Sequence, residues 1–153
     1  MRYLFLLLLV LTPTMVFAGG DGQRGADQPK LDALANPVLL TPVVSNKRFD
    51  PRGAHEYIWF DVTWDTTKLP KPTRRVKGFF LITDLFGAVK VIFDWVIAKP
   101  MVPGTALTEG GIGFEFNQYR APHMWVFATD LKDMVITFTV TGILYQDGTR
   151  VIR

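Results

Sequence analysis

The side chains that could do chemistry in this 153-residue chain are few and scattered. Its two histidines, His55 and His123, are far apart, its only serine is Ser45, and it has no cysteine. Ser45 lacks the flanking glycines of the usual nucleophile turn, and structural zinc would need several histidine or cysteine ligands. We therefore predict no catalytic nucleophile, no disulfide, no metal site and no cofactor.

The carboxylates need separate consideration, because two acids that are distant in sequence can form a hydrolytic pair once the chain folds. Asp84 and Asp94 lie in FLITDLFGAVKVIFDW, residues 80–95. Asp84 precedes Gly87 in a short turn, where an aspartate accepts hydrogen bonds from backbone N–H groups and a glycine accepts a positive φ. Asp94 alternates with the aromatic residues beside it and should face water. The pattern favours the scaffold of a hairpin over a reactive site.

The segment FEFNQYRAPHMW, residues 114–125, concentrates aromatic side chains, amides, an arginine and a histidine. Large aromatic surfaces and arginine are favoured where proteins recognise partners. We expect Phe114, Phe116 and Trp125 to fill the core and the residues between them to form a loop. The predicted partner-binding residues of that loop are Asn117, Gln118, Arg120 and His123.

Several segments alternate with the two-residue period of a β-strand, so we predict that strands hold these residues in place. Residues 134–140 place apolar side chains on one face and threonines on the other. In residues 89–97, one face carries Val89, Val91, Phe93, Trp95 and Ile97, and the opposite face carries Lys90, Ile92, Asp94 and Val96. Residues 55–64 are apolar on both faces, which is typical of a central or covered strand. The side chains predicted to form the core are Trp59 or Trp64, Phe80, Ile82, Val91, Phe93, Met134, Ile136 and Phe138.

Turn residues separate these segments. The prolines of residues 69–72 and 99–104 predict rigid loops, Gly110-Gly111 predicts a break, and Asp147-Gly148 predicts a tight turn. No segment sustains helical periodicity over ten residues. About seven short strands favour an all-β fold, a single antiparallel Ig-like β-sandwich over residues 37–153.

The N-terminus has the composition of a secretory signal. Arg2 precedes an apolar run from Tyr3 to Leu11, and Val16-Phe17-Ala18 then stand ahead of Gly19-Gly20, as at a signal cleavage site. We predict a cleaved signal peptide over residues 1–18, a flexible polar leader over 19–36, and a periplasmic or secreted protein with no membrane span after cleavage. The run is shorter than the ~20 apolar residues that a spanning helix needs.

The charge of the chain is modest. Its formal net charge is +3, and its lysines and arginines show one local excess, over residues 68–77. A nucleic-acid-binding protein would carry a denser basic stripe. We expect no nucleic-acid partner.

Residues 75–104 resemble the pattern of FxLYD-type domains, which are small Ig-like β-sandwich modules of exported bacterial proteins. The matching features are Val76 and Gly78 at a strand opening, Asp84 and Gly87 at a turn, and Pro103-Gly104 before the next strand. The run Tyr145–Gly148 is similar to the same kind of element. Residues 80–84 only approximate the Phe-x-Leu-Tyr-Asp string itself. The resemblance implies a fold and a compartment, and it implies no reaction.

Two functions follow as expectations. The first is a non-enzymatic exported binding or accessory module of the bacterial envelope that engages a protein or peptide partner. The alternative is a hydrolase of envelope polymers whose paired carboxylates, such as Glu115 and Asp94, are brought together by folding.

Overall fold

The computed structural model describes residues 38–52 and 55–152 of the chain. They form seven strands, one α-helix and one short 3₁₀ helix. In chain order these are β1 (Thr41–Arg52), β2 (His55–Asp65), β3 (Thr73–Asp84), β4 (Val89–Ile97), β5 (Leu107–Phe116), α2 (Ala121–Ala128), η2 (Leu131–Asp133), β6 (Met134–Tyr145) and β7 (Arg150–Ile152). The predicted signal peptide and leader lie outside the described residues.

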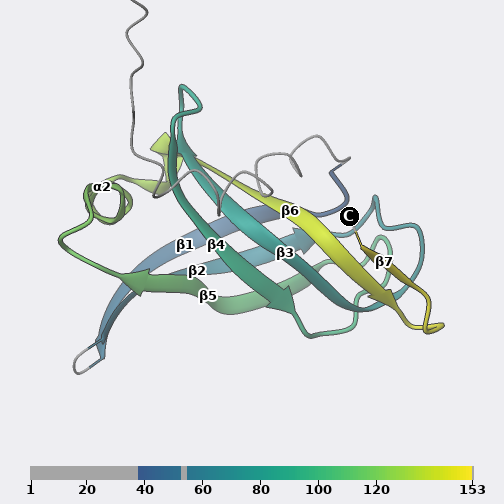
Figure 1. Ribbon diagram of the computed structural model, residues 1–153. Coiled ribbons are helices and arrows are strands. Elements are labelled where there is room, and N and C mark those ends of the chain that lie inside the picture. The colour runs from purple at the N-terminus through teal and green to yellow at the C-terminus, as the bar shows by residue number, and fades with distance from the viewer. Residues whose placement is uncertain (1–37, 53–54, 153) are drawn as a thin grey trace, which may run out of the picture.

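The strands make two antiparallel sheets (Figure 1). One has three strands in the order β1-β2-β5, and the other has four in the order β4-β3-β6-β7. The sheets lie face to face, so the expected antiparallel β-sandwich is confirmed. No helix among the described residues is long and apolar enough to cross a membrane.

The core lies between the two sheets and is rich in aromatic rings. The Trp64 ring from the three-stranded sheet lies 4.9 Å from Phe138 and 5.6 Å from Phe80 in the other sheet. Six of the side chains predicted to form the core are buried, namely Trp64, Phe80, Ile82, Val91, Met134 and Phe138. Phe93 and Ile136 are partly buried against them. The alternation of apolar residues therefore identified the inner face correctly.

The turn between β3 and β4 has the scaffolding role predicted for it. The Asp84 side chain accepts hydrogen bonds from the N–H groups of Phe86 (3.0 Å) and Ala88 (2.9 Å). Gly87 has a φ of 84°, which a residue with a side chain rarely adopts. Lys90 Nζ lies 2.9 Å from the second carboxylate oxygen of Asp84. Asp84 is thus fully engaged in holding a tight hairpin.

The predicted break at Gly110-Gly111 is wrong, because β5 continues through both glycines. The pairing of β2 with β5 shifts between Phe60 and Val62, so the two glycines form a bulge, and Gly111 has a φ of 76°. Asp61 lies opposite the bulge and accepts hydrogen bonds from Asn46 (3.1 Å), from Arg48 (2.8 Å) and from the Gly111 N–H. These bonds, Asn46 foremost, lower the pKa of Asp61. One carboxylate therefore ties the three strands together on the outer face of their sheet.

The expected loop over residues 117–123 is also partly wrong, because α2 begins at Ala121. Pro122 lies in the first turn, where its missing N–H costs no helical hydrogen bond. The last turn of α2 carries no basic residue of its own. Instead, Lys47 Nζ on β1 donates to the carbonyls of Val126 (2.8 Å), Phe127 (3.0 Å) and Thr129 (2.5 Å). The helix is held at its C-terminal end by a strand of the three-stranded sheet.

Candidate functional site

The turn that joins β5 to α2 is built by local hydrogen bonds. The Asn117 side-chain oxygen accepts from the Tyr119 N–H (2.9 Å), and the Asn117 carbonyl accepts from the Arg120 N–H (3.0 Å). The Arg120 carbonyl then accepts from the N–H groups of His123 (3.0 Å) and Met124 (3.1 Å), which starts the helix. Asparagine is suited to this position because its side chain can bond backbone groups two residues away.

His123 fixes this turn from inside. Its side chain is only 7% exposed, and its ring lies 5.0 Å from that of Phe114 in an edge-to-face arrangement. Its Nδ1 accepts a hydrogen bond from the Asn117 N–H (3.1 Å). Burial, and secondly the charge of Arg120, lowers the pKa of His123. Because Nδ1 is the acceptor, the neutral ring carries its proton on Nε2. In this arrangement Nε2 can donate a hydrogen bond, and the ring has no free nitrogen to act as a base.

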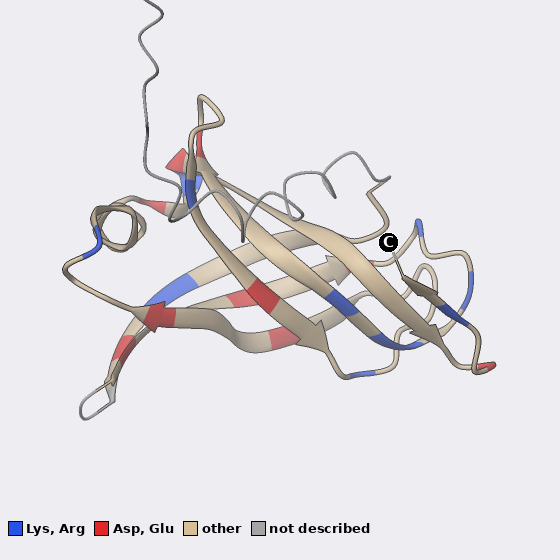
Figure 2. Cartoon of the chain, viewed as in Figure 1, with Lys and Arg blue, Asp and Glu red and all other residues tan. Residues whose placement is uncertain are grey.

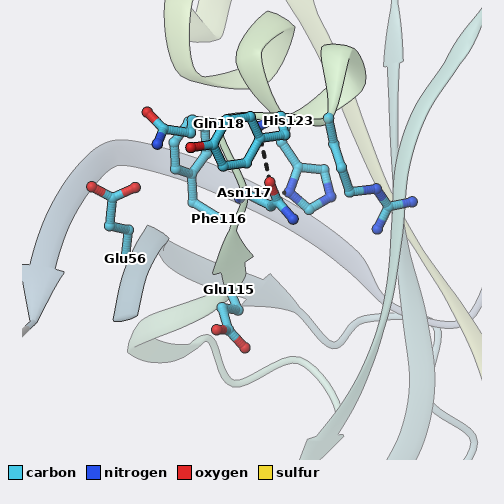
Figure 3. Close-up of a pocket in the computed structure, with 8 residues that line it drawn as sticks. Glu56, Glu115, Phe116, Asn117, Gln118 and His123 are labelled. Carbon is cyan, nitrogen blue, oxygen red and sulfur yellow. Dashed lines mark hydrogen bonds between the residues drawn. The ribbon is translucent and has the colours of Figure 1, made fainter. Parts of the chain in front are cut away.

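A hollow of about 690 Å³ opens where this turn leaves the sheet (Figure 3). All four residues that the sequence predicts to bind a partner line it. The full lining is Glu56, Glu115, Phe116, Asn117, Gln118, Tyr119, Arg120 and His123. The structure thus gathers the predicted residues at one place, with His123 at its inner wall and the other three on its exposed rim.

Sequence reasoning missed two residues of the hollow. Tyr119 is 89% exposed, whereas Phe114 and Phe116 of the same segment are buried and Trp125 is partly buried. No separate prediction was made for the Tyr119 ring. Glu56 comes from β2, and it reaches the hollow because it pairs with Phe116 in the register of β2 and β5. A signal for Tyr119 did exist, because it lies between two polar residues. Nothing in the sequence identified Glu56.

The two acids proposed for hydrolysis are not brought together. Glu115 lies on β5, and its carboxylate points away from the His123 ring (Figure 3). It forms a 2.8 Å pair with His55 Nδ1 in which both side chains are largely exposed. Asp94 lies on β4 in the other sheet, is exposed, and does not line the hollow. No group of three histidine, aspartate or glutamate residues in the described ranges could hold a metal ion.

The hollow has the composition of a recognition surface. It offers one exposed phenol, a guanidinium, two primary amides and two carboxylates, beside a turn whose backbone is held by local hydrogen bonds. An ordered turn loses little conformational entropy when a partner binds. Comparison of this chain with protein-family models, with curated proteins and with solved structures finds no match.

Proposed function

We propose that this protein is a non-enzymatic, exported binding module of the bacterial envelope that engages a protein or peptide partner at the hollow beside α2. The observation that carries the proposal is the rim of that hollow. Tyr119 is almost wholly exposed, and Gln118 and Arg120 flank it on a turn that is fixed by Asn117 and His123. Exposed tyrosine and arginine on a rigid support are the side chains that most often dominate binding energy.

Export rests on the N-terminal sequence, in which an apolar run is followed by Val16-Phe17-Ala18 before Gly19. The resemblance of residues 75–104 to FxLYD-type modules of exported bacterial proteins supports the same compartment. Mass spectrometry of the protein from its native host tests this part, with a mature N-terminus at Gly19 as the expected result. An intact Met1 would contradict cleavage.

The binding site is tested by a double variant of the rim. Tyr119→Ala with Arg120→Ala should leave the folded structure intact, because both side chains are exposed. We expect partners captured by the wild type from an envelope extract to be lost, and the association constant of an identified partner to fall at least about tenfold.

A second double variant, Lys99→Ala with Lys132→Ala, is the control, since both lysines are exposed and lie away from the hollow. It should capture the same partners as the wild type. Equal capture by the rim variant would place the binding site elsewhere on the surface, and capture of no partner by the wild type would remove the support for a binding module.

A further inference from the structure

The outer face of the four-stranded sheet buries two large apolar side chains. Phe80 and Ile82 of β3 belong to the core between the sheets, so Phe79 and Leu81, which alternate with them, point to the outer face. A solvated outer face of an antiparallel sheet leaves its side chains in contact with water. Phe79, however, is only 1% exposed, and Leu81 is only 8% exposed. Another part of the molecule therefore covers this face.

The neighbouring side chains of the same face do not provide the cover. The partners of Phe79 and Leu81 across the sheet are Asp94 and Ile92 on β4 and Thr139 and Thr137 on β6. Asp94 and Thr137 are themselves exposed. Figure 1 shows the four-stranded sheet in front of the three-stranded sheet, and no labelled helix or strand lies in front of it. Within the described ranges, no strand or helix thus lies over Phe79 and Leu81.

The centre of this face also carries little charge. β6 has no charged residue, and β3 has none from Gly78 to Thr83. Figure 2 shows both stretches in tan. The part of β3 that carries Phe79 and Leu81 is therefore suited to contact with an apolar segment.

The cover belongs to the same chain, because the structure contains a single chain. Outside the described ranges are residues 1–37, 53–54 and 153. Residues 53–54 join β1 to β2 in the other sheet, and Arg153 follows β7, which is separated from β3 by β6. The N-terminal residues are therefore the source of the cover.

The described chain begins close to this face. Val38 is 56% exposed, so the chain begins at the surface. Pro42 and Val44 of β1 line a small hollow together with Met134 and Ile136 of β6. β1 thus enters the sandwich beside β6, and β6 is the neighbour of β3.

Residues 19–37 have the length and the composition to cross the face. A segment of this length extends up to about 60 Å, whereas neighbouring strands lie only about 5 Å apart. Its apolar residues gather near its end, at Leu31, Leu34 and the alanines beside them. Leu31 and Leu34 are three positions apart, a spacing that allows both side chains to contact one surface.

We propose that residues 19–37 fold back over the outer face of the four-stranded sheet, with Leu31 and Leu34 packed on Phe79 and Leu81. The contact is intramolecular, so it does not depend on protein concentration. It adds a third layer to the sandwich, and it uses none of the residues that line the hollow beside α2. The leader expected from the sequence thus contains a docking segment.

Thiol labelling tests the cover directly, because the chain has no cysteine of its own. Leu81→Cys places a thiol under the proposed cover, and Phe86→Cys places one at a position that is 98% exposed. With every variant made in the full chain, Leu81→Cys should react with a thiol reagent at least about tenfold more slowly than Phe86→Cys. Ile92→Cys, opposite Leu81 on β4, is a second reporter if Leu81→Cys does not fold.

Removing the two leucines should open the face. Leu31→Ser with Leu34→Ser should raise the labelling rate of Leu81→Cys at least about tenfold, because burial of two leucines contributes more than a factor of ten to the equilibrium. The labelling rate of Val91→Cys should not change, since Val91 is buried on the core side of the same sheet. This second reporter distinguishes the uncovering of one face from unfolding.

Gln23→Ser with Gln28→Ser is the matched control, because it changes two polar residues of the same segment. It should leave the labelling rates of Leu81→Cys and Val91→Cys unchanged.

Four results would overturn the proposal. Labelling of Leu81→Cys as fast as that of Phe86→Cys would show that the face is open. Protection that survives Leu31→Ser with Leu34→Ser would assign the cover to another part of the chain. An equal rise in the rates of Leu81→Cys and Val91→Cys would show general unfolding in place of a local cover. Protection that is lost on dilution would assign the cover to a second copy of the chain.

Discussion

The imidazole of His123 makes a hydrogen bond that only its neutral form can accept. Its Nδ1 holds the Asn117 N–H, and its ring is buried beside Phe114. Protonation would replace this acceptor with a second donor and would bury a charge. The shape of the hollow beside α2 therefore depends on the protonation state of one residue.

This dependence predicts a loss of stability in mild acid. Burial lowers the pKa of His123 in the folded protein below its ordinary value of 6.5, so the unfolded chain binds the proton first as the pH falls. The contribution to the free energy of unfolding is complete above about pH 6.5, and it declines as the pH falls through the folded pKa. His123→Asn keeps an acceptor without a titrating group, so its melting temperature should vary less between pH 7 and about pH 5.5.

His55→Gln provides the matched control, because it removes the other described histidine at an exposed position. It should keep the wild-type dependence of melting temperature on pH. An unchanged dependence in His123→Asn would show that the ring does not couple to folding.

At the scale of elements, α2 depends on a residue outside its own sequence. A helix leaves its last carbonyls without intrahelical partners, and Lys47 on β1 supplies donors to three carbonyls at this end. The ammonium group also lies where the helix dipole favours a positive charge. Partial burial, opposed by the charge of Asp130, lowers the pKa of Lys47.

Lys47→Met should therefore loosen α2 and the turn that precedes it. Leaving these carbonyls without their donor should lower the free energy of unfolding by roughly 1–3 kcal/mol, as measured by urea denaturation. Amide exchange should accelerate in α2 and much less in β3. Lys132→Met, at a largely exposed lysine, is the control and should change stability by only a few tenths of a kcal/mol. A similarly small change in stability for Lys47→Met would show that Lys47 does not stabilise the C-terminal end of α2.

Local chemistry explains which elements the sequence predicts well. The β3–β4 hairpin is predictable because Asp84 and Gly87 specify it within a few residues. α2 is not predictable in this way. It has eight residues, its apolar side chains are both buried (Val126) and exposed (Phe127), and its anchor Lys47 is 79 positions from Val126 in the chain. A short helix held by a distant lysine leaves no periodic pattern to detect.

At the scale of the whole molecule, the alternation of apolar residues identified the inner face of each strand. It did not identify which strands pair or which side chains meet across the sheets. β2 is apolar on both faces, so the sequence left Trp59 and Trp64 as alternatives for the core, and the opposite sheet decides for Trp64. Four residues that line the hollow beside α2 were predicted to bind a partner from one chain segment. The contribution of Glu56 depends on the register of two strands, which no local pattern specifies.

Two phenylalanines, one buried between the sheets and one exposed, should differ in their contribution to stability. The Phe138 ring lies 4.9 Å from both Trp64 and Phe80, whereas Phe86 is almost wholly exposed. Phe138→Ala should lower the free energy of unfolding by about 3–5 kcal/mol, a large part of a typical total of about 5–15 kcal/mol. Phe86→Ala should leave it nearly unchanged in urea titrations of dilute protein. Similar losses in both variants would contradict the assignment of the core.

The pairing of β3 with both β4 and β6 has a consequence for the rate at which the chain folds. The β3–β4 ladder joins neighbours in the chain, but the β3–β6 ladder closes a loop that contains β4, β5 and α2. Closing a long loop loses entropy before any contact compensates for it, and chains dominated by such pairings fold in milliseconds to seconds. Until β6 pairs with it, the apolar run of β3, which is buried in the native protein, stays exposed on that edge. β6 comes later in the chain than β4, β5 and α2.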